Sequence, residues 1–558
     1  MNQPSNPLIV QSDMSVLLEV MNPLFEEARD ALSSFAELQK SPEYMHTYKI
    51  TSLSLWNAAS SGTGADGVIH ILNKYSKHPL PDIVSATIIN NSERYGKVRL
   101  VEEAGRFFLE CNDETVSLEV RAALKTPGGG RIEVSSAFRG QMKQILLKIG
   151  YPVVDLAGYG DAAEFSIALK DSFTPRWYQN EAADAFHAGG SVMGGSGVIV
   201  LPCGAGKTMV GITVMDKVGV ETLILTTGIT ALRQWRDELL DKSCIPPEHI
   251  GEYSGEVKEI KPVTITTYQT LTHRRSKDDP FTHFELFNHR NWGLIIYDEV
   301  HMLPAPVFRV TSEIQSKRRL GLTATLIRED GLEGDVFSLI SSKKYDLPWK
   351  ALEKTGYIAE ASCTEVRVPL TDADRYEYAI APKRNKFRIA AENKQKLAAL
   401  TLLLEKHSRD NVLVIGQYVQ QLKHISQSIG APMITGSTKN DERELLYTAF
   451  KRGEIKTLVL SKVANFAIDL PDANVAIEIS GAFGSRQEEA QRLGRILRPK
   501  PGDNKAWFYA LVSDDTNELD FSAKRQMFLT EQGYKYSIVR HEGLATKQAV
   551  KQGDDSSA

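Results

Sequence analysis

A glycine-rich segment with the sequence LPCGAGKT, at residues 201–208, offers the most specific chemistry in the chain. An apolar run precedes it and an amphipathic run follows, which predicts the order strand, loop, helix. Gly204 and Gly206 would let backbone N–H groups surround a phosphate chain, and Lys207 would contact its β and γ phosphates. The hydroxyl of Thr208 is then placed to ligate Mg²⁺. The strict pattern GxxxxGKT begins with glycine and this segment with leucine, so the loop is a variant that needs support elsewhere in the chain.

Two acidic residues supply part of that support. Asp298 and Glu299 directly follow the most apolar run of the chain, at 294–297. An aspartate at the carboxyl end of a parallel strand is where a second Mg²⁺ contact belongs, and Glu299 would orient and deprotonate the attacking water. An acidic pair after a strand can also be a solvated turn. The predicted strands between the pair and the phosphate loop favour the catalytic interpretation.

The segment QEEAQRLGRILR contains arginines that could neutralise phosphate charge. Arg495 and Arg498 are three residues apart, which predicts that both lie on one face of a helix. Two guanidinium groups there could reach a γ-phosphate, and such an arginine finger contributes about 10³–10⁵ in rate. The alternative is a surface helix held by salt bridges, which Glu488 and Glu489 favour for Arg492.

Two series of short apolar runs alternate with helical patterns after residue 171. Such alternation predicts parallel sheets covered by helices on both faces, and hence an α/β fold with two tandem domains. We expect these domains at 171–345 and 346–540. Their strands are expected at 198–201, 222–226, 263–266, 294–297 and 320–322, and then at 412–415, 432–434, 457–460, 475–479 and 507–512.

The residues before 171 predict accessory domains. Residues 1–102 begin with a short strand at 8–11 and continue with three short helices at 53–58, 67–74 and 81–94 and a strand at 97–101, which suggests a winged-helix-like unit. Residues 103–170 suggest a small α+β module with strands at 106–110 and 131–135 and a helix at 137–149. Residues 541–558 are polar and are expected to be disordered.

Charge, cysteine content and apolar segments indicate the general class of protein and its cellular compartment. The 558 residues carry a formal net charge of −4, so any electropositive track for nucleic acid must be local. The four cysteines form no CxxC pair, so they indicate no zinc or disulfide framework and favour a reducing compartment. The pattern of a signal peptide and the length of a membrane span are both missing from the sequence. We expect a soluble cytoplasmic protein without a membrane partner.

Several strings together resemble the XPB family of superfamily 2 DNA helicases, in its prokaryotic form. They are LPCGAGKT, LIIYDEVH, RRLGLTATLIRED, SKVANFAIDLP and SRQEEAQRLGRILRPK. The resemblance implies two RecA-like motor domains that use ATP and Mg²⁺ and act with 3′→5′ polarity on single-stranded and on forked or duplex DNA in repair. It also implies a damage-recognition role for residues 103–170. The match runs from about residue 174 to residue 500, and over residues 1–170 it rests on domain order alone.

The resemblance also implies roles for single residues. Gln179 would read adenine through its amide, and Asp469 would lie near the ribose. Residues 372–396, which are basic, aromatic and helical in pattern, match a thumb-like insertion, although a solvated helical face fits the same pattern. The residues implied in DNA contact or in coupling it to the nucleotide are Arg233, Gln234, Trp235, Thr267, Gln269, Thr323, Thr325, Arg328, Glu329 and Asp330.

Two other functions stay open at this point. One is a translocase on double-stranded DNA that does not separate the strands. The other is a DNA-binding repair scaffold whose ATPase only switches its affinity, with a nuclease partner performing the chemistry. An RNA helicase fits less well, because the RED and DEVH strings resemble DNA-directed relatives.

Overall fold

The structure is a computed structural model in which the chain forms two compact units. The first combines Met1–Leu201 with Gly206–Leu347, and the second combines Pro202–Ala205 with Pro348–Ala558. In the described part of the chain, no helix has the length and apolar character needed to cross a membrane. The residues that the structure describes are 3–42, 44–128, 130–276, 279, 281–315, 317–326, 331, 333–461, 473–481, 483–500 and 504–543.

A seven-stranded sheet forms the centre of the first unit. Its strand order is β11-β12-β10-β13-β14-β9-β15, and every neighbouring pair is parallel. The five strands predicted for this domain are present, which confirms the α/β class. The two edge strands escaped prediction because they are short and carry charged or polar residues. The strands are β9 Ser196–Val200, β10 Thr222–Thr226, β11 Ile250–Tyr253, β12 Val263–Thr267, β13 Leu294–Asp298, β14 Arg318–Thr323 and β15 Lys343–Asp346.

Helices cover both faces of this sheet, and alternate residues of its strands pack against the helices on one face or the other. Val198 and Val200 belong to a core cluster that also contains residues of α10, α11, α12 and α13. On the other face, Gly211 of α8 packs against Trp235 of α9 and Leu322 of β14. Side chains point to opposite faces of a strand in turn, so apolar runs are required where helices cover both faces. The helices are α7 Trp177–His187, α8 Lys207–Val218, α9 Ile229–Lys242, α10 Tyr268–Thr272, α11 Leu286–His289, α12 Ala305–Glu313 and α13 Glu333–Leu339.

The second unit contains another seven-stranded sheet in which every neighbouring pair is parallel, in the order β18-β19-β17-β20-β21-β16-β22. All five strands predicted here are present. The prediction missed β16 and β22, since polar residues interrupt both runs. Both sheets are of the RecA-like type. The strands are β16 Glu360–Val368, β17 Val412–Ile415, β18 Met433–Ile434, β19 Thr457–Leu460, β20 Val475–Glu478, β21 Lys505–Ser513 and β22 Tyr536–Arg540.

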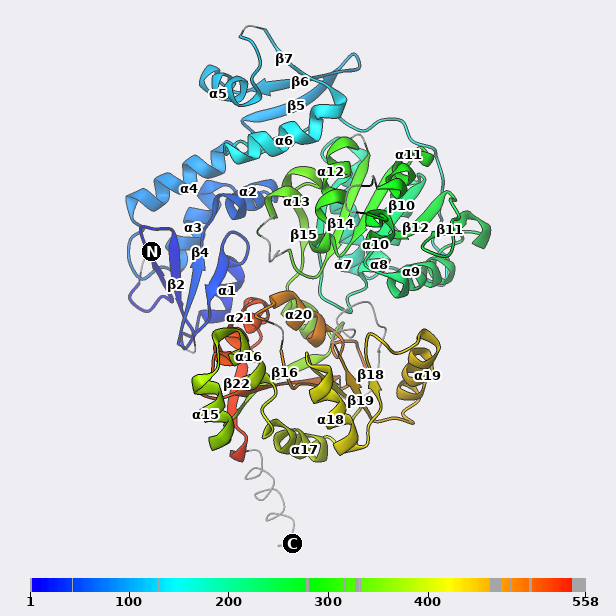
Figure 1. Cartoon of the computed structure of the whole chain (residues 1–558). Helices are drawn as coiled ribbons and strands as arrows, with labels where there is room; N and C mark the ends of the chain where they lie inside the picture. Colours follow the sequence, from blue (N-terminus) through cyan, green and yellow to red (C-terminus); the bar gives the residue numbers. More distant parts are fainter. Residues whose placement is uncertain are drawn as a thin grey trace. The chain divides into compact units, whose positions relative to one another are not determined.

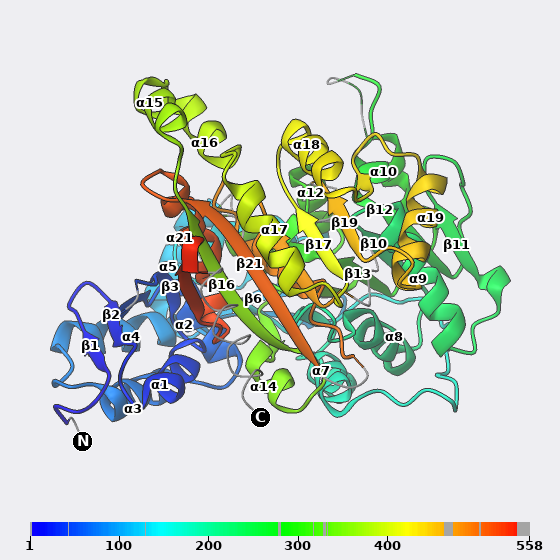
Figure 2. The same cartoon turned by 90° about the horizontal axis from the view of Figure 1, so that it is seen from below.

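Helices cover this sheet, and two of them form an extension. Residues 372–396 contain α15 and α16, which extend beyond the end of β16 in Figure 2. Of the large apolar side chains on α15, Tyr376 and Ile380 are exposed. The helices are α14 Trp349–Lys354, α15 Asp372–Ile380, α16 Lys383–Ala391, α17 Lys396–Lys406, α18 Val419–Ile429, α19 Asn440–Lys451, α20 Arg486–Gly494 and α21 Glu518–Glu531.

The N-terminal region of the first unit holds a four-stranded antiparallel sheet in the order β1-β2-β4-β3. Of this sheet the sequence predicts only the first strand, and it also predicts the three helices that follow the sheet. The elements are β1 Leu8–Val10, β2 Ser15–Glu19, α1 Phe25–Leu32, β3 Glu37–Lys40, β4 Met45–Lys49, α2 Ser52–Ser60, α3 Ala65–Tyr75 and α4 Asp82–Arg94.

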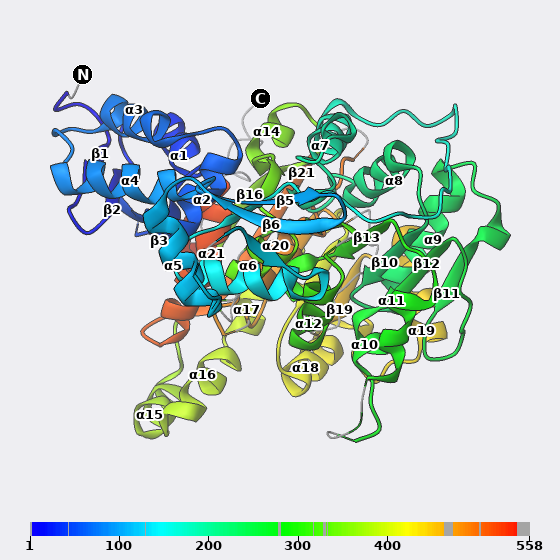
Figure 3. The ribbon, with the colours of Figure 1, turned by 90° about the horizontal axis from the view of Figure 1, so that it is seen from above.

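A second small sheet, in the order β7-β6-β5-β8, follows α4. Its strand β5 spans Val98–Glu103 and pairs with β6, so the strand at the expected boundary of residue 102 belongs to this sheet. We call residues 98–155 the accessory module. Its helix α6 packs against α12 and α13, which lie beside the first seven-stranded sheet (Figure 1), and Figure 3 shows α6 next to α12 from another side. The remaining elements are β6 Arg106–Cys111, α5 Glu114–Leu124, β7 Ile132–Val134, α6 Arg139–Lys148 and β8 Val153–Asp155.

Candidate active site

The phosphate loop connects β9 to α8, as the sequence predicted. Gly204 and Gly206 have φ values of +81° and +78°, a region that residues with a side chain rarely occupy. Gly206 is the N-cap residue of α8, and Lys207 begins the helix. A glycine-rich turn that opens a helix directs backbone N–H groups toward an anion. The backbone here therefore fits a phosphate group.

Gln179 lies against the end of this loop. A Cβ added at Gly206 would approach Gln179 Nε2 to 2.6 Å, so glycine is required by contact as well as by conformation. The Gln179 side chain is buried, and its Oε1 accepts a hydrogen bond of 2.8 Å from the backbone N–H of Arg176. The structure thus places Gln179 beside the phosphate loop, while adenine recognition stays a prediction.

Asp298 is the last residue of β13 and is held from two sides. The indole N–H of Trp235 donates to Asp298 Oδ2 at 3.0 Å, and the Tyr268 hydroxyl donates to the Asp298 carbonyl at 2.9 Å. Burial, together with the charge of the neighbouring Glu299, raises the pKa of the Asp298 carboxyl to about 6, although Trp235 and Lys207 oppose the shift. A fixed carboxylate oxygen at this position suits a hard cation.

Glu299 joins the acidic pair to the phosphate loop. Its φ of +50° and ψ of +57° are left-handed values, which are uncommon for a residue with a side chain. Glu299 Oε1 lies 3.4 Å from Lys207 Nζ, and Glu299 Oε2 lies 3.4 Å from His301 Nδ1. The structure therefore brings Lys207, Asp298 and Glu299 together, and backbone strain of this kind is typical of functional sites.

The TAT segment, residues 323–325, is hydrogen-bonded to the DEVH segment, residues 298–301. Thr323 Oγ1 lies 2.7 Å from His301 Nδ1. The same oxygen accepts from the Thr325 N–H at 3.1 Å and lies 2.5 Å from the Thr325 carbonyl oxygen. Both threonines are buried. Their contacts fit a role in coupling, and direct contact with DNA would require them to become exposed.

The structure contradicts the expected DNA contact of Trp235. Its side chain is only 1% exposed, and its indole N–H donates a hydrogen bond to Asp298 inside the protein. Thr267 is also buried, and its hydroxyl caps α10 by accepting from the Thr270 N–H at 3.1 Å. Arg233 and Gln269 are exposed and Gln234 is partly exposed, so DNA contact by these three stays a prediction.

The prediction that Arg495 and Arg498 share one helical face is wrong. Helix α20 ends at Gly494 and Arg495 is its C-cap residue. The Leu497 carbonyl accepts from the Ala359 N–H at 2.8 Å, so by residue 497 the chain has left the helix and runs beside the residues that lead into β16. The role of Arg495 and Arg498 at the γ-phosphate stays a prediction, and it no longer rests on helical spacing.

A buried ion-pair network holds α20, and sequence reasoning missed it. Arg492 is fully buried and pairs with Glu478 of β20, and its Nη2 also lies 3.3 Å from Glu488 Oε2. Arg525 of α21 contributes Nη2, 3.0 Å from Glu478 Oε1, and Nε, 3.4 Å from Glu489 Oε2. Arg492 is thus paired as expected, but in the core and not on the surface.

The protonation of this network is uneven. Burial and the charge of Glu478 together raise the pKa of Glu489 to about 8. The two arginines hold the pKa of Glu478 at about 2 against its burial. The Tyr536 hydroxyl also donates to Glu489 Oε1 at 3.0 Å. One carboxylate therefore carries the negative charge, and the other keeps its proton near neutral pH.

Four residues expected at the site lie outside the described residues. They are Arg328, Glu329, Asp330 and Asp469. Their expected roles stay predictions.

The phosphate loop, the acidic pair and the two parallel sheets define the class as P-loop proteins with two RecA-like domains. A family model described as ERCC3/RAD25/XPB C-terminal helicase matches residues 352–556. Models described as type III restriction enzyme, res subunit, and as helicase conserved C-terminal domain match residues 172–328 and 8–131.

Curated relatives match the chain over almost its whole length. A DNA 3′-5′ helicase XPB of Mycobacterium tuberculosis is 53% identical over 541 residues, which cover 95% of this chain and 97% of the relative. One of Kineococcus radiotolerans is 51% identical and covers 96% of each chain. The general transcription and DNA repair factor IIH helicase/translocase subunit XPB/SSL2 of Saccharomyces cerevisiae is 33% identical and covers 96% of this chain and 72% of the relative. This chain belongs to the XPB family of DNA helicases.

Proposed function

We propose that this protein is an ATP-dependent 3′→5′ DNA helicase that unwinds DNA during repair in the cytoplasm. The observation that carries the proposal is the approach of Lys207 Nζ to 3.4 Å from Glu299 Oε1, beside a glycine-rich turn that fits phosphate. This arrangement occurs in a chain 53% identical to a DNA 3′-5′ helicase XPB.

The residues of the site divide the work of hydrolysis. Lys207 and the first turn of α8 bind the phosphates, and the Thr208 hydroxyl and Asp298 carboxylate would hold Mg²⁺. The ion, when bound, supplies positive charge to the phosphate oxygens. Glu299 orients the attacking water and accepts its proton. In the bound state, the phosphates would take Lys207 away from Glu299 and leave that carboxylate available to the water.

Other residues complete the proposed cycle. Arg495 and Arg498 supply positive charge to the γ-phosphate in the transition state. Arg233, Gln234 and Gln269 contact the DNA backbone, which fixes a strand without reading its sequence. Arg328, Glu329 and Asp330 support strand separation, and Thr323 and Thr325 link the nucleotide state to the grip on DNA.

A strand-separation assay tests the proposal. Forked DNA and substrates with a 3′ or a 5′ tail are incubated with the native protein, with Lys207→Ala and with Lys217→Ala as the matched control. Lys217 also lies on α8, but its Nζ pairs with Asp184 at 2.9 Å at the far end of the helix. We expect ATP-dependent unwinding of the 3′-tailed substrate that Lys207→Ala abolishes and Lys217→Ala retains.

Two results would indicate a different function. ATP hydrolysis on duplex DNA without strand release would indicate a double-stranded DNA translocase. ATP binding without repeated turnover would indicate a repair scaffold, which would require a nuclease partner. Preference for the 5′ tail would refute the proposed polarity.

A further inference from the structure

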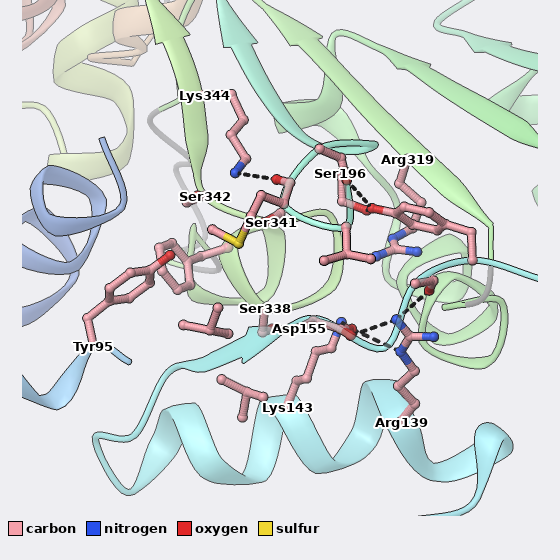
Figure 4. Close-up of a pocket in the computed structure, with 18 residues that line it drawn as sticks. Tyr95, Arg139, Lys143, Asp155, Ser196, Arg319, Ser338, Ser341, Ser342 and Lys344 are labelled. Carbon is pink, nitrogen blue, oxygen red and sulfur yellow. Dashed lines mark hydrogen bonds and ion pairs between the residues drawn. The ribbon is translucent and has the colours of Figure 1, made fainter. Parts of the chain in front are cut away.

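A small polar cavity lies between the accessory module and the first motor domain. Its volume is about 50 Å³. Residues of α6 and β8 line one side, and residues of β9, β14, α13 and β15 line the other (Figure 4). The phosphate loop and the DEVH segment do not contribute to it, so it is separate from the proposed nucleotide site.

Positive charge dominates this cavity. Arg139, Lys143, Arg319 and Lys344 line it, and Asp155 is the only carboxylate among the described residues that do so. Four basic side chains thus face one carboxylate. Arg139, Lys143 and Arg319 are buried, so solvent screens their charges poorly.

Asp155 is already shared by two of these cations. Its Oδ1 and Oδ2 accept from Arg139 at 2.6 and 2.9 Å, and its Oδ2 also pairs with Lys143. Lys143 Nζ donates in addition to Gln315 Oε1 at 2.8 Å. Burial lowers the pKa of Lys143 to about 7, which reflects the cost of charge at this place.

Arg319 and Lys344 find only neutral oxygens in the described structure. Arg319 Nε donates to the Leu339 carbonyl at 2.8 Å and its Nη1 to the Gln315 carbonyl at 2.7 Å. Lys344 Nζ donates to the Met193 carbonyl at 3.1 Å. A carbonyl satisfies a donor but does not neutralise its charge, so the cavity retains an excess of positive charge.

We propose that this cavity binds one tetrahedral oxyanion of the phosphate class. A water molecule needs about 10–15 Å³ of such space, so a cavity of this volume has room for about four oxygen-sized atoms. Ser196 and Ser342 add hydroxyl groups to the lining, which suit the remaining oxygens of the ion. Shape and charge therefore both favour an oxyanion over an apolar ligand.

The bound ion would join two parts of the first unit. Lys143 belongs to α6 of the accessory module, and Arg319 belongs to β14, which leads directly into Thr323. The two parts already touch closely here, because a Cβ added at Gly140 would overlap the Ser312 carbonyl. An oxyanion between them would tighten the docking of α6 beside the strand that carries the TAT segment.

Thermal unfolding with inorganic phosphate tests the proposal. Because phosphate also suits the phosphate loop, the measurements use Lys207→Ala as well as the native chain, with chloride at equal ionic strength as the reference. We expect the unfolding temperature of both proteins to rise with phosphate concentration. Adding Lys143→Met to Lys207→Ala should weaken the apparent affinity for phosphate at least about tenfold.

A matched substitution separates this site from general charge effects. Lys317→Met also removes a lysine next to β14, but Lys317 Nζ bonds to Asn291 Oδ1 outside the cavity. We expect Lys317→Met to leave the phosphate affinity of Lys207→Ala unchanged. Lys344→Met is a second cavity variant, at a partly exposed position, and it should also weaken phosphate binding. It replaces Lys143→Met in the test if that variant fails to fold.

The source of the oxyanion is distinguished by a parallel titration with a 5′-phosphorylated dinucleotide. Stabilisation by this probe that depends on Lys143 would identify a terminal phosphate of nucleic acid as a ligand. Stabilisation by inorganic phosphate alone would identify the free ion. Phosphate stabilisation that disappears in Lys207→Ala, or that persists unchanged in both Lys143→Met and Lys344→Met, would overturn the proposal.

Discussion

The hydrogen bond from Trp235 to Asp298 gives the sharpest test of the proposed site. Trp235→Phe removes the indole N–H that donates to Asp298 Oδ2 at 3.0 Å and keeps an aromatic ring in the core. The Asp298 carboxylate then loses the donor that fixes its orientation. We expect ATP hydrolysis to fall because this carboxylate is proposed to hold Mg²⁺.

The size of the effect follows from the type of hydrogen bond. A hydrogen bond to a charged group contributes about 1.5–3 kcal/mol. If that contribution is lost from transition-state stabilisation, kcat/KM for ATP should fall about 10- to 150-fold, since about 1.4 kcal/mol corresponds to a factor of ten. Steady-state phosphate release in the presence of DNA measures the change.

Trp292→Phe provides the control. Trp292 is fully buried in the same unit, and its indole N–H donates at 2.9 Å to the carbonyl of Leu286. Both substitutions remove an indole donor and the same ring volume, so both should lower thermal stability. We expect only Trp235→Phe to lower kcat/KM beyond the effect of stability. Equal kcat/KM for the two variants would refute the assignment of Trp235 to the nucleotide site.

Three further predictions concern the acidic pair and the buried network. Glu299→Gln should still bind ATP but hydrolyse it at least about 100-fold more slowly, as expected for loss of a general base, and an enzyme that kept most of its DNA-stimulated activity would exclude that role. Glu489 has a pKa of about 8 in the folded chain against an ordinary value of 4.5, so the folded state holds an extra proton between these values and the free energy of unfolding should fall as pH rises through this range. Glu489→Gln should flatten this slope in denaturant titrations, and an unchanged slope would show that another group causes it. Gly481→Ala should destabilise the chain by about 1–3 kcal/mol, because the added Cβ would overlap the Arg525 guanidinium; unaltered stability in the same titrations would contradict the packing.

The central strands of both sheets could be predicted from the sequence because burial on two faces demands continuous apolar runs. The run at 294–297 became β13, and the acidic pair after it lies at the carboxyl end of the strand as expected. Strands β11, β15, β16 and β22, which lie at or next to an edge of a sheet, could not be predicted in this way. In β16, which spans Glu360–Val368, polar residues alternate with buried ones, so the run lacks the continuous apolar signal.

The local chemistry of the site was predictable, but long-range partners were not. The order strand, GKT, helix fixes where Lys207 lies, since these residues are adjacent in sequence. Trp235 is 63 residues away from Asp298, and no local pattern indicates that its indole reaches that carboxylate. The pairing of Arg492 with Glu478 is equally invisible, because a charged residue in a helical pattern normally indicates a solvated face.

The Thr323 hydroxyl also determines where a proton sits on His301. A hydroxyl has one hydrogen, and the Thr325 carbonyl 2.5 Å away can only accept it. His301 Nδ1, 2.7 Å from the same oxygen, must then carry its own hydrogen and donate. A neutral His301 is therefore the Nδ1–H tautomer, with Nε2 as the acceptor. Any movement that separates the Thr325 carbonyl from the Thr323 hydroxyl would release the hydroxyl hydrogen and permit the other tautomer. The conformation of the TAT segment therefore determines the tautomer of His301, whose Nδ1 also lies close to Glu299.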